Sequence, residues 1–66
     1  MEGEPRTREA LINSAINMFQ QHGFQMTRVS DIVAAAGVAQ GTFYNYFRSK
    51  EVIFREICMD FMEQVR

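Results

Sequence analysis

Apolar residues recur every three or four positions along most of the chain, which is the spacing of an amphipathic helix. The first stripe consists of Leu11, Ile12, Ala15, Ile16 and Phe19. It predicts a helix over residues 6–22, with Pro5 suited to the first helical position, where a backbone N–H is not needed. We expect Gly23 to end this helix in the left-handed conformation, with Phe24 folded back onto the last turn.

A second, shorter helix is predicted over residues 28–36. Its buried face consists of Val29, Ile32, Val33 and Ala36. Thr27 is expected to be the N-cap, with its hydroxyl accepting a backbone N–H from the first turn, and Asp31 suits the positive end of the helix dipole. Gly37 then ends the helix, and Val38 is expected to pack underneath it.

The pattern predicts two further helices, over residues 40–47 and 50–66, with Ser49 as the N-cap of the last one. The apolar stripe of the last helix is Phe54, Ile57, Cys58, Phe61, Met62 and Val65. That stripe is wider than one neighbouring helix would cover, so it forms either ordinary core or a surface for further protein. No segment alternates like a half-buried strand. We therefore predict an all-α fold: a three-helix, homeodomain-like helix-turn-helix bundle with the start of a fourth, connecting helix.

The outward face of the third helix has an unusual composition. At about 100° per residue, Phe43 and Phe47 point one way and Asn45 points the opposite way. Tyr44 and Tyr46 lie on the two shoulders of the helix. The outward positions carry small or hydrogen-bonding groups without charge: Gly41, Thr42 and Asn45. Amide and hydroxyl groups on a slim helix suit base recognition in a DNA major groove.

Composition and charge limit the remaining possibilities. The chain has 66 residues and a net charge of -1, but residues 26–50 contain three basic residues and one acidic residue, while both flanks are acidic. A single cysteine excludes an internal disulfide, and no apolar run approaches the length of a membrane span. The first residues lack the apolar core of a signal peptide. We expect one small cytoplasmic domain without a membrane segment.

Neither Cys58 nor His22 has neighbours in the sequence that suggest catalysis or metal binding. Cys58 lies in an apolar stripe and is predicted to be an inert core residue, and His22 suits the negative end of the first helix. We predict no cofactor, no metal site and no enzymatic activity. An enzyme that uses Cys58 or His22 is the weakest alternative.

Residues 27–51 as a whole resemble the signature of the tetracycline-repressor (TetR) family of transcriptional regulators. The matching elements, in order and spacing, are Thr27, Ile32, Ala36-Gly37-Val38, Gly41-Thr42-Phe43-Tyr44, Phe47 and Ser49-Lys50-Glu51. Upstream, the segment from Phe19 to Phe24 is similar to the end of that family's first helix. The resemblance covers nearly the whole chain and implies a DNA-binding domain over residues 1–66.

The resemblance also implies which residues contact double-stranded DNA. Contacts to the sugar–phosphate backbone are implied for Thr27, Arg28, Tyr44, Tyr46 and Lys50. Contacts in the groove are implied for Gln40, Gly41, Thr42 and Asn45. The alternatives from the helical wheel are that Tyr46 belongs to the core and that Gln40 lies too close to the buried side to read a base. Expected core residues are Ile32, Val33, Val38, Phe43 and Phe47.

Three positions depart from the family pattern. Ala39 stands where serine often caps the recognition helix, a loss of about 1 kcal/mol. Val33 stands where alanine is common, so the two short helices are expected to pack slightly wider apart. Val52 stands where glutamate would complete a capping box with Ser49.

For a full-length parent protein, the resemblance implies a homodimer on a palindromic operator, released by a small molecule. That molecule would bind a C-terminal ligand-binding and dimerisation domain, which we take to be absent from these 66 residues. The alternative function is a helical protein-interaction module that keeps the fold without DNA binding. Its support is the acidic net charge and the wide apolar stripe of the last predicted helix.

Overall fold

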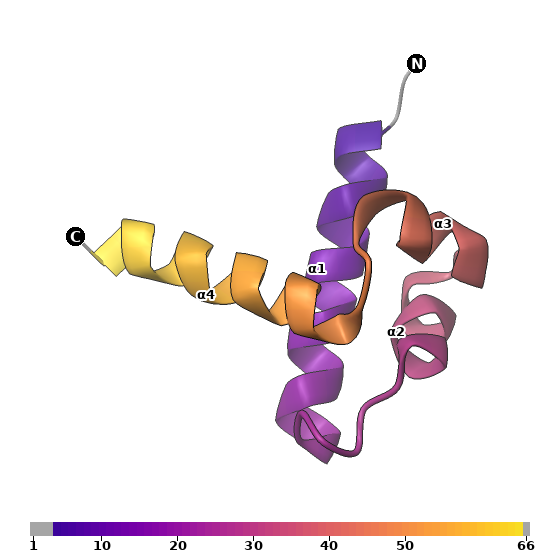
Figure 1. Cartoon of the computed structure of the whole chain (residues 1–66), viewed down its shortest axis with the longest axis horizontal. Coiled ribbons are helices and arrows are strands. Elements are labelled where there is room, and N and C mark those ends of the chain that lie inside the picture. Colours follow the sequence, from indigo (N-terminus) through magenta and orange to yellow (C-terminus); the bar gives the residue numbers. More distant parts are fainter. Residues whose placement is uncertain (1–3, 66) are drawn as a thin grey trace.

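The computed structural model describes the backbone of residues 4–65 and the side chains of residues 6–59. Its elements are four helices: α1 (Glu4–His22), α2 (Val29–Ala36), α3 (Gln40–Tyr46) and α4 (Lys50–Val65) (Figure 1). Within this range there is no strand, and the all-α prediction is confirmed. α1 begins two residues earlier than predicted, and Arg66, the predicted end of the last helix, lies outside the described residues.

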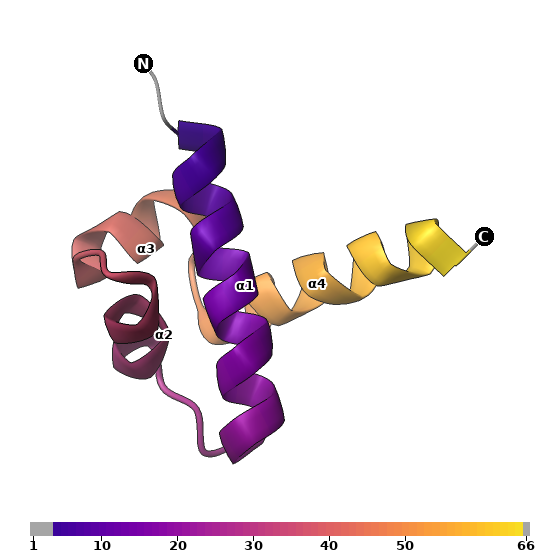
Figure 2. The same ribbon diagram turned by 180° about the vertical axis from the view of Figure 1, so that it is seen from behind.

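The long α1 is the axis of the molecule. α2 and α3 pack on one side of it, and α4 starts against α1 and then extends away on the other side, as both views show (Figures 1 and 2). Among the described residues, no helix is long and apolar enough to cross a membrane. The arrangement leaves the far face of α3 uncovered by any other described helix.

The core lies between α1 and the other three helices. Its buried apolar residues are Leu11, Ala15, Ile32, Val33, Phe43, Phe47 and Ile53. Four of the five predicted core residues are in this set, and the fifth, Val38, is half-buried and packs against it. The helical spacing therefore predicted the inward faces of α1, α2 and α3 correctly.

Glycines end α1 and α2 as predicted. Gly23 has φ 82° and Gly37 has φ 76°, both in the left-handed region that side chains with a Cβ rarely adopt. The Gly23 N–H donates to the Phe19 carbonyl at 2.8 Å, and the Gly37 N–H donates to the Val33 carbonyl at 2.8 Å. Phe24 returns to the last turn of α1, with its ring centroid 5.3 Å from that of Phe19.

The prediction that Thr27 caps α2 is wrong. Arg28 is the N-cap, and its backbone N–H donates to Asp31 Oδ2 at 3.0 Å. The Thr27 hydroxyl instead lies 3.0 Å from the Met18 carbonyl and 2.8 Å from the Gly23 carbonyl, and its side chain is fully buried. The reason is that Thr27 still belongs to the turn after α1, which its own N–H closes by donating to Gly23 at 3.2 Å.

The predicted apolar stripe of the last helix is partly wrong. Ile53 is fully buried and Ile57 is half-buried against the core, whereas Phe54 is 41% exposed and Cys58 is exposed. The core contact of α4 therefore includes Ile53, which the predicted stripe omitted. Phe54 also packs on α1, with its ring centroid 5.7 Å from that of Phe19, whereas Cys58 is not a core residue. The remaining members of the stripe, Phe61, Met62 and Val65, lie outside the described side chains.

Candidate nucleic-acid interface

α3 has one buried and one exposed face. Phe43 is fully buried and Phe47 is 3% exposed, while Asn45 on the opposite side is exposed. The packing of the two phenylalanines against α1 and α2 therefore sets the rotation of α3 about its own axis. The predicted outward orientation of Asn45 is confirmed.

The start of α3 is slim on its exposed side. Gly41 is exposed, and a Cβ built on it would meet no atom within 4 Å. The protein's own packing therefore does not require a glycine at this position. Gln40 is exposed and Thr42 is half-buried, so both have accessible surface.

The two tyrosines of α3 differ in environment. Tyr44 is 50% exposed, and its ring meets the edge of Phe43 at a centroid distance of 5.3 Å. Tyr46 is half-buried and packs against the core, with its ring centroid 6.4 Å from that of Phe47. Tyr44 thus lies at the surface. Tyr46 belongs partly to the core, which was one of the two alternatives for it, and keeps part of its side chain accessible.

Positive charge on this part of the molecule comes from arginines at two helix ends. The Arg28 side chain is 80% exposed at the start of α2, with its Nε 3.9 Å from Asp31 Oδ2. Arg48 is exposed two residues after the end of α3. Ser30 is exposed in the first turn of α2 and was not among the predicted contact residues. Its position near the N-terminus of a helix, where anions are favoured, was the signal that could have identified it.

Thr27 does not belong to this surface. Its side chain has no exposed area, and its hydroxyl lies within hydrogen-bonding distance of two carbonyls beneath the turn. Because the Thr27 side chain is buried, it offers no accessible surface to a phosphate, and the predicted contact finds no support in the position of this side chain.

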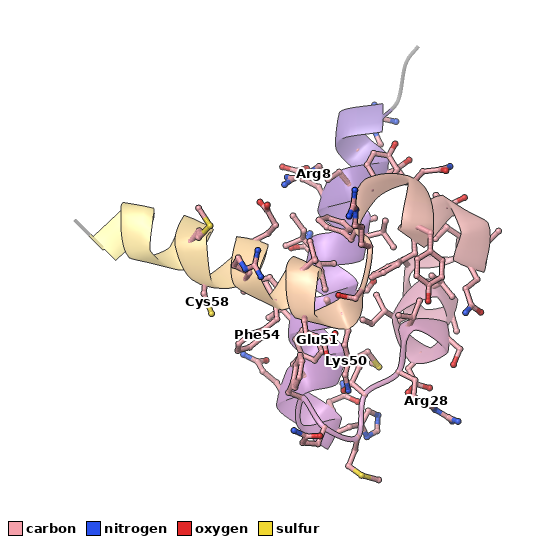
Figure 3. All side chains as sticks on the ribbon, in the orientation of Figure 1. Arg8, Arg28, Lys50, Glu51, Phe54 and Cys58 are labelled. Atoms are coloured by element: carbon pink, nitrogen blue, oxygen red, sulfur yellow. The ribbon has the colours of Figure 1, made fainter. Side chains whose placement is uncertain are left out.

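Lys50, for which a phosphate contact was predicted, is bound within the protein in this structure. Its Nζ donates to the backbone carbonyls of Phe24 at 2.7 Å, Gln25 at 3.2 Å and Thr27 at 2.9 Å. It also lies 4.5 Å from the centroid of the Phe24 ring. Figure 3 shows this side chain at the start of α4, beside the turn between α1 and α2 (Figure 3). An ammonium group has three N–H donors, and all three are engaged within the protein.

Nothing in the geometry of the described residues assembles a metal site. No group of three His, Cys, Asp or Glu side chains lies close enough together there to hold an ion. The accessible surface of α3 and of the α2 N-terminus consists of hydrogen-bonding groups and arginines. Such a surface is suited to recognition through hydrogen bonds and charge.

Comparisons with known proteins agree with this geometry. Residues 11–57 match the family model for bacterial regulatory proteins of the tetR family. An uncharacterised HTH-type transcriptional regulator of Bacillus subtilis, YdgC, is 47% identical over 60 residues, which cover 91% of this chain and 31% of the relative. The transcriptional repressor KstR2 of Mycolicibacterium smegmatis is 38% identical over 85% of this chain and 27% of its own length. These relatives are transcriptional regulators, not enzymes.

A solved structure has the same fold. The fatty acid degradation regulator FadR from Bacillus halodurans superimposes with a TM-score of 0.85 and 33% sequence identity, over 97% of this chain and 32% of that one. The chain thus spans about a third of the length of the proteins that it matches. The match of sequence and fold together shows that this chain belongs to the tetR family of bacterial regulatory proteins.

Proposed function

We propose that this chain binds double-stranded DNA sequence-specifically, with α3 inserted into the major groove. The observation that carries the proposal is the exposed face of α3. Asn45 and Gly41 face solvent, while Phe43 and Phe47 anchor the opposite face in the core. An uncharged, narrow helix face with amide and hydroxyl groups matches the hydrogen-bonding edges of base pairs.

The proposed contacts fall into two groups. Base edges are read from the exposed face of α3 by Gln40, Gly41, Thr42 and Asn45. Phosphates are bound by residues on the flanks of that face: Arg28, Tyr44 and Tyr46. Asparagine and glutamine pair well with adenine through two hydrogen bonds, so Asn45 and Gln40 favour adenine at the positions they reach. The phosphate contacts set the register of α3 without reading sequence.

The charge of the chain sets the strength of binding. Most non-specific DNA affinity comes from neutralising phosphates, and the net charge here is -1. The positive charge near α3 comes mainly from Arg28 and Arg48. A single copy is therefore expected to bind weakly, and two copies on a two-fold-related site are expected to bind much more tightly.

We extend the proposal to a parent protein by family membership alone. Such a protein would act in the cytoplasm as a homodimeric repressor on a palindromic operator, released when a small-molecule effector binds a C-terminal domain. Its half-sites would be spaced by about one helical turn or a multiple. Support comes from relatives whose names describe repressors, such as KstR2 and a probable acrEF/envCD operon repressor of Escherichia coli.

The test is a selection experiment. This chain, fused to a dimerising coiled coil, is incubated with a pool of random duplexes at increasing salt, and the bound fraction is sequenced. We expect enrichment of a two-fold-related motif, with an affinity that falls steeply as salt rises. A helical chain that binds no duplex at low salt would contradict the proposal and favour the protein-interaction alternative.

Asn45→Ala tests the role of α3 directly. We expect the variant to stay folded and to lose preference at the positions that Asn45 reads, at about 1–3 kcal/mol of discrimination. The matched control is Asn17→Ala, which removes an exposed amide from α1, outside the residues proposed to contact DNA. If both variants select the same motif as the parent sequence, Asn45 does not read a base.

A further inference from the structure

The ammonium group of Lys50 closes the turn between α1 and α2. Its three hydrogen bonds reach the carbonyls of Phe24, Gln25 and Thr27, which lie 23 to 26 residues earlier in the sequence. These carbonyls belong to the segment between α1 and α2. One side chain thus gathers three oxygens of an irregular segment around a single positive charge.

The contacts of Lys50 outweigh an unfavourable interaction between its positive charge and the dipole of α4. Lys50 is the first residue of α4, where the positive end of the helix dipole disfavours a cation. Three carbonyl oxygens and the face of the Phe24 ring, 4.5 Å from Nζ, supply the compensating negative potential. A solvated surface lysine would show none of these contacts.

The segment held by Lys50 leads directly into α2. Thr27, whose carbonyl accepts from Nζ at 2.9 Å, is followed by Arg28, the N-cap of α2. The orientation of the Arg28 side chain and of the first N–H groups of α2 therefore depends on where this turn is held. Arg28 belongs to the proposed phosphate-binding flank of the interface, and the N–H groups at the start of α2 lie next to it.

We propose that Lys50 is a positioning residue, which orders the α1–α2 turn and the start of α2 for DNA binding and does not itself contact a phosphate. This inference rests on the proposed DNA-binding function. A phosphate contact by Lys50 would require its ammonium to leave carbonyl partners at 2.7 and 2.9 Å. Leaving the turn carbonyls without these bonds has a cost that the phosphate contact would first have to exceed.

The first experiment uses the unaltered protein, because Lys50 is its only lysine. With ¹⁵N-labelled lysine, NMR reports the ammonium group without overlap. Before any DNA is added, we expect slow hydrogen exchange with water, as for an ammonium held by three acceptors. On addition of the selected duplex, the signal should stay at its position, and a large shift on binding would overturn the proposal.

The second experiment compares Lys50→Met with Arg28→Met. Without DNA, Lys50→Met should accelerate amide exchange at Thr27 and Ile32 on the order of tenfold while leaving Phe47 at the end of α3 unchanged. With DNA, Lys50→Met should bind more weakly with an unchanged slope of log affinity against log salt. Arg28→Met should show the reverse: unchanged exchange and a slope smaller by about 0.9, the effect of one lost phosphate contact.

The outcomes separate this proposal from the proposed function. Unchanged exchange at Thr27 in Lys50→Met, or a slope smaller by about 0.9 in that variant, would overturn the positioning role. A uniform rise in exchange that includes Phe47 would also overturn it, because it indicates global destabilisation. If no duplex is bound, the DNA-binding function fails and the positioning role fails with it, whatever the exchange shows of the turn. If Lys50→Met does not fold, the ammonium measurement on the unaltered protein still decides between contact and positioning.

Discussion

Arg8 and Glu56, which are 48 residues apart in the sequence, form an ion pair with an N–O distance of 3.0 Å. The same guanidinium lies over the ring of Phe47, with Cζ 5.5 Å from the centroid. Arg8 therefore connects α1 both to α4 and to the residue that follows α3. The two contacts differ in their expected energies, because one is a half-exposed ion pair and the other is packing on an aromatic face.

Glu56→Gln is expected to lower the free energy of unfolding only slightly, and Arg8→Ala is expected to lower it more. The side chains of the pair are 42% and 39% exposed, and exposed ion pairs contribute about 0–1 kcal/mol. Removing Arg8 also removes the packing on Phe47, worth roughly 0.5–1 kcal/mol further. Urea denaturation of both variants measures the difference. At high salt the effect of Glu56→Gln should disappear, and the additional cost of Arg8→Ala should remain.

Arg8→Lys separates charge from stacking. Lysine keeps the positive charge and lacks the planar guanidinium, so its stability should lie between those of the original protein and Arg8→Ala. A stability of Arg8→Lys equal to that of the original protein would show that the planar guanidinium contributes nothing beyond what a lysine side chain supplies.

Thr27→Val is expected to destabilise the fold by about 1 kcal/mol through loss of a buried hydroxyl. This loss is at the low end of the range for a buried hydrogen bond, because the Gly23 carbonyl still accepts the Thr27 backbone N–H at 3.2 Å after the hydroxyl is removed. Thr27→Ser retains the hydroxyl and tests the contribution of the methyl group separately. In a DNA titration, Thr27→Val should leave the salt slope unchanged. A reduced slope would mean that the hydroxyl reaches a phosphate despite its burial.

Ala39→Ser should stabilise the domain by about 1 kcal/mol. Ala39 is the N-cap of α3, in extended backbone conformation at φ -76° and ψ 155°, and supplies no side-chain hydrogen bond. A serine hydroxyl there would accept a free N–H of the first turn. The control is Ala35→Ser at an exposed position of α2, which should lower stability by a few tenths of a kcal/mol. Equal urea midpoints for the two variants would contradict the capping argument.

Gly41→Ala should raise stability and lower DNA affinity. The new Cβ meets no atom within 4 Å, and alanine in a helix is favoured over glycine by up to about 1 kcal/mol. The same methyl group projects from the face that we propose to enter the groove. Parallel measurements of thermal unfolding and of binding to the selected duplex should therefore move in opposite directions.

Gly37→Ala provides the contrast for Gly41→Ala. Gly37 also has open space where a methyl group would project, but its φ is 76°. Alanine is strained there, and stability should fall by about 1–2 kcal/mol. A stabilising effect at both positions would show that the left-handed conformation of Gly37 is not maintained.

Local features of the fold were predictable because they depend on short-range spacing. The apolar period of α1, α2 and α3 identified their inward faces, and glycine identified the left-handed ends at Gly23 and Gly37. The outward orientation of Asn45 followed from the burial of Phe43 and Phe47 on the same helix. Each of these depends on residues within about two helical turns of one another.

The face of α4 that is buried could not be predicted from its own pattern. Val52, Ile53, Phe54, Ile57 and Cys58 offer two overlapping apolar stripes. The crossing of α4 over α1 chooses the one that contains Ile53 and exposes Cys58. When a helix has apolar residues around much of its circumference, the packing of the neighbouring helix determines which face is buried.

The sequence by itself therefore determined the four helices, two of their glycine ends and the exposed face of α3. Only the tertiary structure decided that Thr27 is buried and that Lys50 binds three carbonyls of the α1–α2 turn. The physical reason is the range of the interactions. Helical periodicity relates neighbours along the chain, whereas the partner of a polar side chain at a turn or a helix end depends on which distant backbone groups the packing brings within its reach.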